Sequence, residues 1–159
     1  MNMCSVIGVG GMRIYPGVSM VRLGVADVAC SGRFYGRLGW RPSLEASSES
    51  ICFFALNNIV LALFGRVELA HDCGLEAVER VDGNSFAGIT LSQNYGSTAA
   101  VDQAFDAAIG AGGRRLVEPS RTSWGGYHGV FADPDGHVWE LACNPFIELA
   151  VDGTLALPP

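Results

Sequence analysis

The pattern of hydrophobic and polar positions predicts the same order of strands and helix in both halves of this chain. In the first half, the apolar run Met20–Val25 predicts a strand, and Asp27 is a suitable N-cap for a helix that ends at Gly39. Segments 50–55 and 59–64 predict two further strands. This half therefore has a strand, a helix and then short strands.

The second half repeats that order. Segment 88–93 predicts a strand, and Ser97 or Thr98 caps a helix that ends in the glycines of 110–113. Segment 116–119 predicts a short strand. The segment 127–145, YHGVFADPDGHVWELACNP, then predicts a hairpin that closes the unit.

The hairpin carries the acid that first suggests chemistry. Pro134-Asp135-Gly136 forms its turn, with Gly136 in the left-handed position. This turn places Val130 opposite Glu140, so that His128 and Glu140 share one face. A carboxylate at a strand centre costs free energy unless a partner binds it.

The repeat predicts an α+β fold of two paired βαβββ modules. A single helix protects only one face of a sheet, so we expect the halves to pair into a curved mixed sheet with a concave pocket and helices outside. The predicted organisation is an N-terminal extension at 1–16, a domain at 17–148 and a C-terminal tail at 149–159. Within the domain, the modules are 17–65 and 84–148, and the linker is 66–83.

Composition narrows the function classes. The 159 residues carry a net charge of -6, which disfavours nucleic-acid binding. All ten basic residues are arginine, which excludes Schiff-base chemistry and a phosphate-loop lysine. The five cysteines are scattered and contain no CxxC, as expected for reduced thiols in a cytoplasm. No apolar run reaches the length of a membrane span, and the segment before Pro16 lacks the features of a signal peptide.

The segments VRLGVADVACSGRFYGRLGW and WGGYHGVFADPDGHVWELACNP resemble the vicinal oxygen chelate superfamily. This superfamily includes glyoxalases, bleomycin- and fosfomycin-resistance proteins and extradiol dioxygenases, and the resemblance covers about residues 17–148. The resemblance is strongest to small glyoxalase-like proteins of bacteria. It implies two βαβββ modules and a homodimer.

The resemblance also implies a divalent metal held by four positions, which here are Met20, Ala62, Gly88 and Glu140. Only Glu140 is a ligand for a hard metal ion. We therefore expect no cofactor. The alternative is a divalent metal held by Glu140, His128 and neighbouring amides.

The leading hypothesis is a metal-independent small-molecule-binding protein, and the rival is a lyase, isomerase or dioxygenase that uses Glu140 and His128. Glu140 is a candidate general base, a ligand anchor or an ion-pair partner of Arg22. The aromatic and glycine-rich segment 124–127 is a candidate lid. The expected ligand-binding residues are Met20, Arg22, Gly88, Thr90, Gln93, Trp124 and Tyr127.

Overall fold

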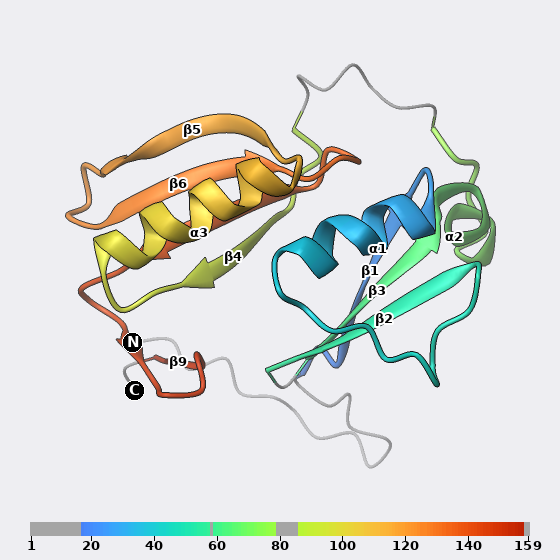
Figure 1. The fold of residues 1–159 in the computed structure, drawn as a ribbon, viewed down its shortest axis with the longest axis horizontal. Coiled ribbons are helices and arrows are strands. Elements are labelled where there is room, and N and C mark those ends of the chain that lie inside the picture. The colour runs from blue at the N-terminus through green and yellow to red at the C-terminus, as the bar shows by residue number, and fades with distance from the viewer. Residues whose placement is uncertain (1–16, 58, 79–85, 158–159) are drawn as a thin grey trace, which may run out of the picture.

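A computed structural model describes residues 17–57, 59–78 and 86–157. Its elements form two modules that lie side by side, with a short tail (Figure 1). The first module and the linker contain β1 (Met20–Val25), α1 (Val28–Arg37), β2 (Ile51–Leu56), β3 (Ile59–Gly65) and α2 (Arg66–Asp72). The second module and the tail contain β4 (Thr90–Asn94), α3 (Thr98–Ala111), β5 (Arg114–Arg121), β6 (Tyr127–Ala132), β7 (Val138–Cys143), β8 (Glu148–Leu149) and β9 (Leu155–Ala156).

The first module forms a three-stranded sheet, here called sheet A, in the order β1-β3-β2. The βαβββ pattern places three strands after α1, and the first of these is reduced to one bridge between Pro42 and Phe54. Pro42 has no backbone N–H to extend a ladder. The chain that follows instead turns on itself, since the Ser47 hydroxyl donates to the Ser43 carbonyl at 2.6 Å and accepts from the Phe53 amide at 3.0 Å.

The second module forms a four-stranded sheet, sheet B, in the order β4-β7-β6-β5. The predicted hairpin register is confirmed, with Val130 opposite Glu140 and His128 opposite Ala142. Gly136 has φ of 90°, as the predicted turn requires. The predicted strand at 88–93 begins later, at Thr90.

Local capping determines where the helices begin. The Asp27 carboxylate accepts from the Cys30 amide at 2.7 Å, which confirms it as the N-cap of α1. Of the two predicted caps for α3, the structure uses Ser97, whose hydroxyl accepts from the Ala100 amide. At the other end of α3, Gly112 has φ of 113° and ends the helix.

One aromatic core joins the modules. The Tyr35 ring of α1 lies 5.8 Å from Phe54 of β2 and 5.9 Å from Trp139 of β7, measured between ring centroids. Phe54 belongs to an outer strand of sheet A, while Trp139 belongs to an inner strand of sheet B. One ring contacts both because the helix-covered sides of the two sheets contribute to one shared core. The opposite faces of the sheets, here called the outward faces, are turned away from this core.

The α+β class and the paired modules are confirmed. The structure adds that the described strands form separate sheets rather than one continuous sheet. The linker contributes a helix, α2, and the tail contributes the hairpin β8–β9. The predicted N-terminal extension at 1–16 lies outside the described residues.

Candidate functional site

A row of three polar side chains crosses the outward face of sheet B. The Ser92 hydroxyl of β4 donates to Glu140 Oε2 at 2.9 Å, and His128 Nδ1 of β6 lies 2.7 Å from Glu140 Oε1. Ser92 is directly opposite Glu140 in the parallel pair β4–β7. The side chains of His128 and Glu140 are 26% and 29% exposed, so both remain accessible to a ligand. Adjacent strands therefore hold the carboxylate from two sides.

This row assigns a tautomer to the neutral form of His128. An ionised carboxylate only accepts hydrogen bonds, so in the neutral imidazole the proton lies on Nδ1. The Nε2 lone pair is then free to accept a proton or a ligand hydrogen bond. A carboxylate orients a general-base histidine in the same way in hydrolytic enzymes.

The candidate residues of the first module lie on the outward face of sheet A. The Arg22 guanidinium is 5.6 Å from the centroid of the Phe64 ring, and Arg22 is opposite Ala62 in the β1–β3 register. Met20, two residues before Arg22 on β1, lies on the same face. The considered ion pair between Arg22 and Glu140 does not form within the chain, since Arg22 lies over Phe64 in sheet A and Glu140 contacts Ser92 and His128 in sheet B.

The remaining candidates are distributed over several surfaces. Thr90 lies on the Glu140 face, and Gly88 precedes β4 with φ of 84°. The Tyr127 hydroxyl donates to Asp102 of α3 at 2.7 Å, so it faces the helix. Trp124 is 44% exposed in the loop between β5 and β6. Within a single chain, the residues that share the outward face of sheet B are therefore His128, Glu140 and Thr90.

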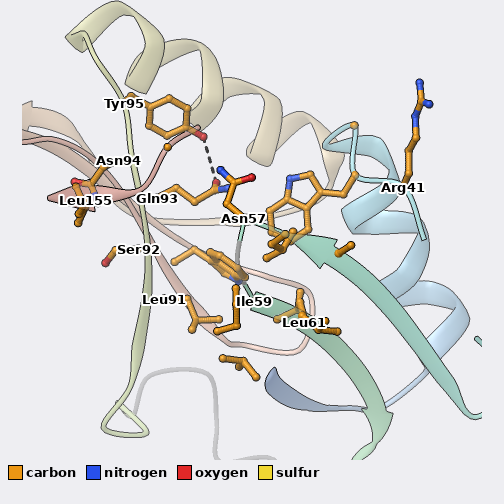
Figure 2. Close-up of a pocket in the computed structure, with 18 residues that line it drawn as sticks. Arg41, Asn57, Ile59, Leu61, Leu91, Ser92, Gln93, Asn94, Tyr95 and Leu155 are labelled. Atoms are coloured by element: carbon orange, nitrogen blue, oxygen red, sulfur yellow. Dashed lines mark hydrogen bonds between the residues drawn. The ribbon is translucent and has the colours of Figure 1, made fainter. Parts of the chain in front are cut away.

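A cavity lies elsewhere, between the two modules. It has a volume of about 640 Å³, and Gln93 is the only ligand-binding candidate that lines it. Figure 2 shows Leu91 and Gln93 pointing from β4 toward Ile59 and Leu61, whereas Ser92 points away from them. Ser92 also borders the cavity, but its hydroxyl binds Glu140, so the Ser92–Glu140–His128 hydrogen bonds lie on the other face of β4.

The four positions that resemblance assigns to a metal do not fit one. Ala62 has no ligand atom and is 0% exposed, and a thioether and a glycine are poor donors for a hard ion. Within the described ranges, no group of three His, Cys, Asp or Glu side chains could hold a metal ion.

The strongest electrostatic perturbation belongs to a buried contact between the modules. The Asp133 carboxylate accepts from the Tyr35 hydroxyl at 2.7 Å and from His137 Nδ1 at 2.9 Å. Burial raises the pKa of Tyr35 far above its ordinary value, and Asp133 adds to that rise. Burial also acts to raise the pKa of Asp133, but the His137 and Tyr35 contacts outweigh it and lower that pKa. This cluster joins the hairpin turn to α1 and is structural.

Sequence reasoning missed Ser92 as a functional residue. Resemblance directed attention to Gly88, while the register places Ser92 opposite Glu140. The alternation of Thr90, Ser92 and Asn94 was an available signal, because these side chains share the face that carries Glu140.

Comparison with known proteins identifies the family. The model of the glyoxalase/bleomycin resistance protein/dioxygenase superfamily matches residues 17–141. The chain belongs to this superfamily. As a member, it shares the fold of a glyoxalase-related enzyme from Fulvimarina pelagi, with 31% identity, a TM-score of 0.79, and coverage of 91% of this chain and 100% of that chain.

Two solved structures of lower identity show likeness in fold alone. A superfamily enzyme from Burkholderia phytofirmans PsJN has a TM-score of 0.68 at 20% identity, with coverage of 79% of this chain and 96% of that chain. A lactoylglutathione lyase from Agrobacterium tumefaciens has a TM-score of 0.59 at 19% identity, with coverage of 82% and 96%. The comparison with curated proteins gave no match. Among the described residues, no helix is long and apolar enough to cross a membrane.

Proposed function

We propose that this superfamily member binds a small organic molecule on the outward face of sheet B, with Glu140 as the polar anchor and without a metal ion. The observation that supports this most directly is the half-buried carboxylate held between Ser92 and His128. Such a carboxylate is positioned before a ligand arrives, so little ordering is required on binding. A ligand hydroxyl, amide or amine that donates a hydrogen bond fits this site.

We further propose that a homodimer completes the binding surface. The outward face of sheet A carries Met20, which is 40% exposed, and a Phe53–Phe64 pair with ring centroids 6.3 Å apart. Aromatic side chains on a partly exposed sheet face are favourable at an interface. A two-fold axis would place sheet A of each chain against sheet B of the other and form two equivalent sites. Arg22 and Met20 would then approach Glu140 across the interface.

A second candidate function is metal-free acid–base catalysis. It is favoured by the 2.7 Å contact of His128 Nδ1 with Glu140, which leaves Nε2 available as a base. This reaction class includes proton transfer at a carbon acid. Binding and catalysis require the same face, but only catalysis requires His128 Nε2 to accept a proton from the substrate.

The first experiment combines elemental analysis with a thermal-shift screen of small aromatics, antibiotics and glutathione adducts. Hits are remeasured by calorimetry on Glu140→Gln and on a matched control, Glu148→Gln, whose carboxylate is exposed on β8. We expect Glu140→Gln to weaken binding about tenfold, since it removes a charge-assisted hydrogen bond. Glu148→Gln should bind as the parent does. Equal affinity in all three proteins, or a stoichiometric divalent metal, would contradict the proposal.

A separate experiment tests the dimer and the rival activity. Light scattering should give twice the chain mass, and Phe53→Glu should lower it, whereas Leu44→Glu, in a loop where Leu44 is 82% exposed, should not. For any hit that is turned over, His128→Gln should abolish turnover and leave binding within a few-fold. Turnover that survives His128→Gln would exclude its role as the base.

A further inference from the structure

The cavity between the modules has the properties of a second binding site. Its volume of about 640 Å³ is within the range of small-molecule pockets. It lies on the side of β4 to which Leu91 and Gln93 point (Figure 2), whereas the Ser92 hydroxyl binds Glu140 on the other side. Nothing in the proposed function uses it.

The walls of the cavity are mostly apolar and partly aromatic. The Trp40 and Trp139 rings both line it, with centroids 5.6 Å apart, and Leu56, Ile59, Leu61 and Leu91 complete the apolar wall. Aromatic walls of this kind favour flat ligands. Both modules contribute to the walls, so a bound molecule would contact sheet A and sheet B together.

One carboxamide supplies a directed polar contact. Gln93 Oε1 accepts a hydrogen bond from the Tyr95 hydroxyl at 3.2 Å, which holds the amide in place. Burial raises the pKa of Tyr95, consistent with a hydroxyl that stays protonated and donates. The Gln93 NH₂ group is then available to donate to a ligand carbonyl. Figure 2 shows this amide beside Asn57, at the polar end of the cavity.

The charge of the lining determines the class of ligand. Among the described lining residues, the only ionisable group charged at neutral pH is Arg41, and its side chain extends away from the other labelled residues in Figure 2. No charged group is therefore directed at the apolar wall, where an unpaired ligand charge would be costly. We propose that the cavity between the modules binds an uncharged, planar aromatic molecule whose carbonyl accepts a hydrogen bond from the Gln93 amide.

The test uses a pair of probes that differ in charge, 4-nitrobenzamide and 4-nitrobenzoate, with the full chain. Calorimetry should show saturable binding of 4-nitrobenzamide and at least tenfold weaker binding of 4-nitrobenzoate. Because nitroaromatics quench indole emission, a Trp124→Phe background restricts the signal to Trp40 and Trp139, and quenching should saturate with the same affinity. Equal affinity for the two probes would overturn the charge argument.

Substitutions then locate the probe. Gln93→Glu keeps the oxygen that Tyr95 binds but removes the NH₂ donor, and it should weaken 4-nitrobenzamide binding at least fivefold. The matched control Gln103→Glu makes the same change on the exposed side of α3 and should have no effect. Ile59→Trp should reduce binding by occupying the cavity, whereas Leu116→Trp on β5 should not. Circular dichroism checks that each variant is folded.

The outcomes separate this site from the Glu140 face. Glu140→Gln should leave 4-nitrobenzamide binding unchanged, and Gln93→Glu should leave ligands of the Glu140 face unchanged. Loss of 4-nitrobenzamide binding in Glu140→Gln would assign the probe to that face and overturn the cavity proposal. An absence of saturable binding in the parent protein, or equal binding by Gln93→Glu and the parent, would overturn it as well.

Discussion

Ala62 and Glu140 lie at corresponding places in the two modules, each on the strand that pairs with the first strand of its sheet. Ala62 is opposite Arg22 and is completely buried, whereas Glu140 is opposite Ser92 and remains 29% exposed. The outward face of sheet A is consequently apolar around a stacked arginine, while that of sheet B presents an oriented carboxylate. The repeated fold supplies equivalent positions, and the side chains decide which of them can do chemistry.

The hairpin turns of the two modules also differ, in the contacts that their side chains make. In sheet B, Asp133 and Asp135 join the turn to α1, through Tyr35 and Ser31 respectively. In sheet A, the corresponding turn at Asn57 lines the cavity between the modules. The turn of sheet B therefore holds the two modules together, whereas the turn of sheet A borders the cavity between them.

The largest expected effect comes from removing the charge of Asp133 in the turn between β6 and β7. Asp133→Asn keeps the shape but removes the charge that accepts from Tyr35, His137 and two backbone amides. We expect the free energy of unfolding to fall by about 3 kcal/mol, as for other buried hydrogen-bonded carboxylates. Urea denaturation measures this. Asp106→Asn on the exposed side of α3 is the control, and an equal loss in both variants would show that Asp133 has no special role.

The second effect follows from the lowered pKa of Asp133. A carboxyl with a lower pKa in the folded state stabilises the fold above its unfolded pKa of about 3.9, and this contribution is lost as the pH falls through the folded value. The unfolding free energy of the parent should therefore decrease with acid below about pH 4. Asp133→Asn should flatten this decrease. Parallel pH profiles of the two proteins, measured by urea denaturation, would contradict the assignment.

The third prediction exchanges the chemistry of the two faces. Ala62→Glu places a carboxylate where no solvent reaches, and it should lower the unfolding free energy by about 2–3 kcal/mol despite the nearby Arg22. Glu140→Ala at the half-exposed position should cost only about 1 kcal/mol. Thermal and urea denaturation give both values. A similar cost for the two changes would show that the modules do not differ in this respect.

The smallest effect tests the support of Glu140 from β4. Ser92→Ala removes one of its two side-chain donors and should lower the unfolding free energy by about 0.5–1 kcal/mol. The change should also weaken ligands of the Glu140 face about threefold. Ser123→Ala, in the loop between β5 and β6 where Ser123 is exposed, is the control. A larger effect in the control would remove Ser92 from the site.

Much of the local structure was predictable from the sequence. The hairpin register around Glu140 and the N-cap at Asp27 are confirmed, because turn and cap geometry depend on neighbouring residues. The βαβββ pattern predicted three strands after α1 in the first module, and the first of them is only a single bridge at Pro42. A proline that stops a ladder is a local signal that could have been used.

The candidate site was predictable only in part. The register of one hairpin predicts that His128 and Glu140 share a face, and the structure shows their contact at 2.7 Å. Ser92 was missed because its pairing with Glu140 joins segments that are far apart in the chain. Met20 was grouped with Glu140 by the resemblance and Arg22 by its place beside Met20 on the first strand, although within one chain both belong to the outward face of sheet A.

The sequence by itself determined the repeated elements, the family and the acid at Glu140, because alternation, caps and turns act over a few residues. Only the tertiary structure decided which faces meet. Tyr35 brings Phe54 and Trp139 into one core, and this turns Arg22 and Glu140 outward while leaving the cavity beside Gln93. Side-chain packing between distant segments sets that arrangement, and no short pattern in the chain encodes it.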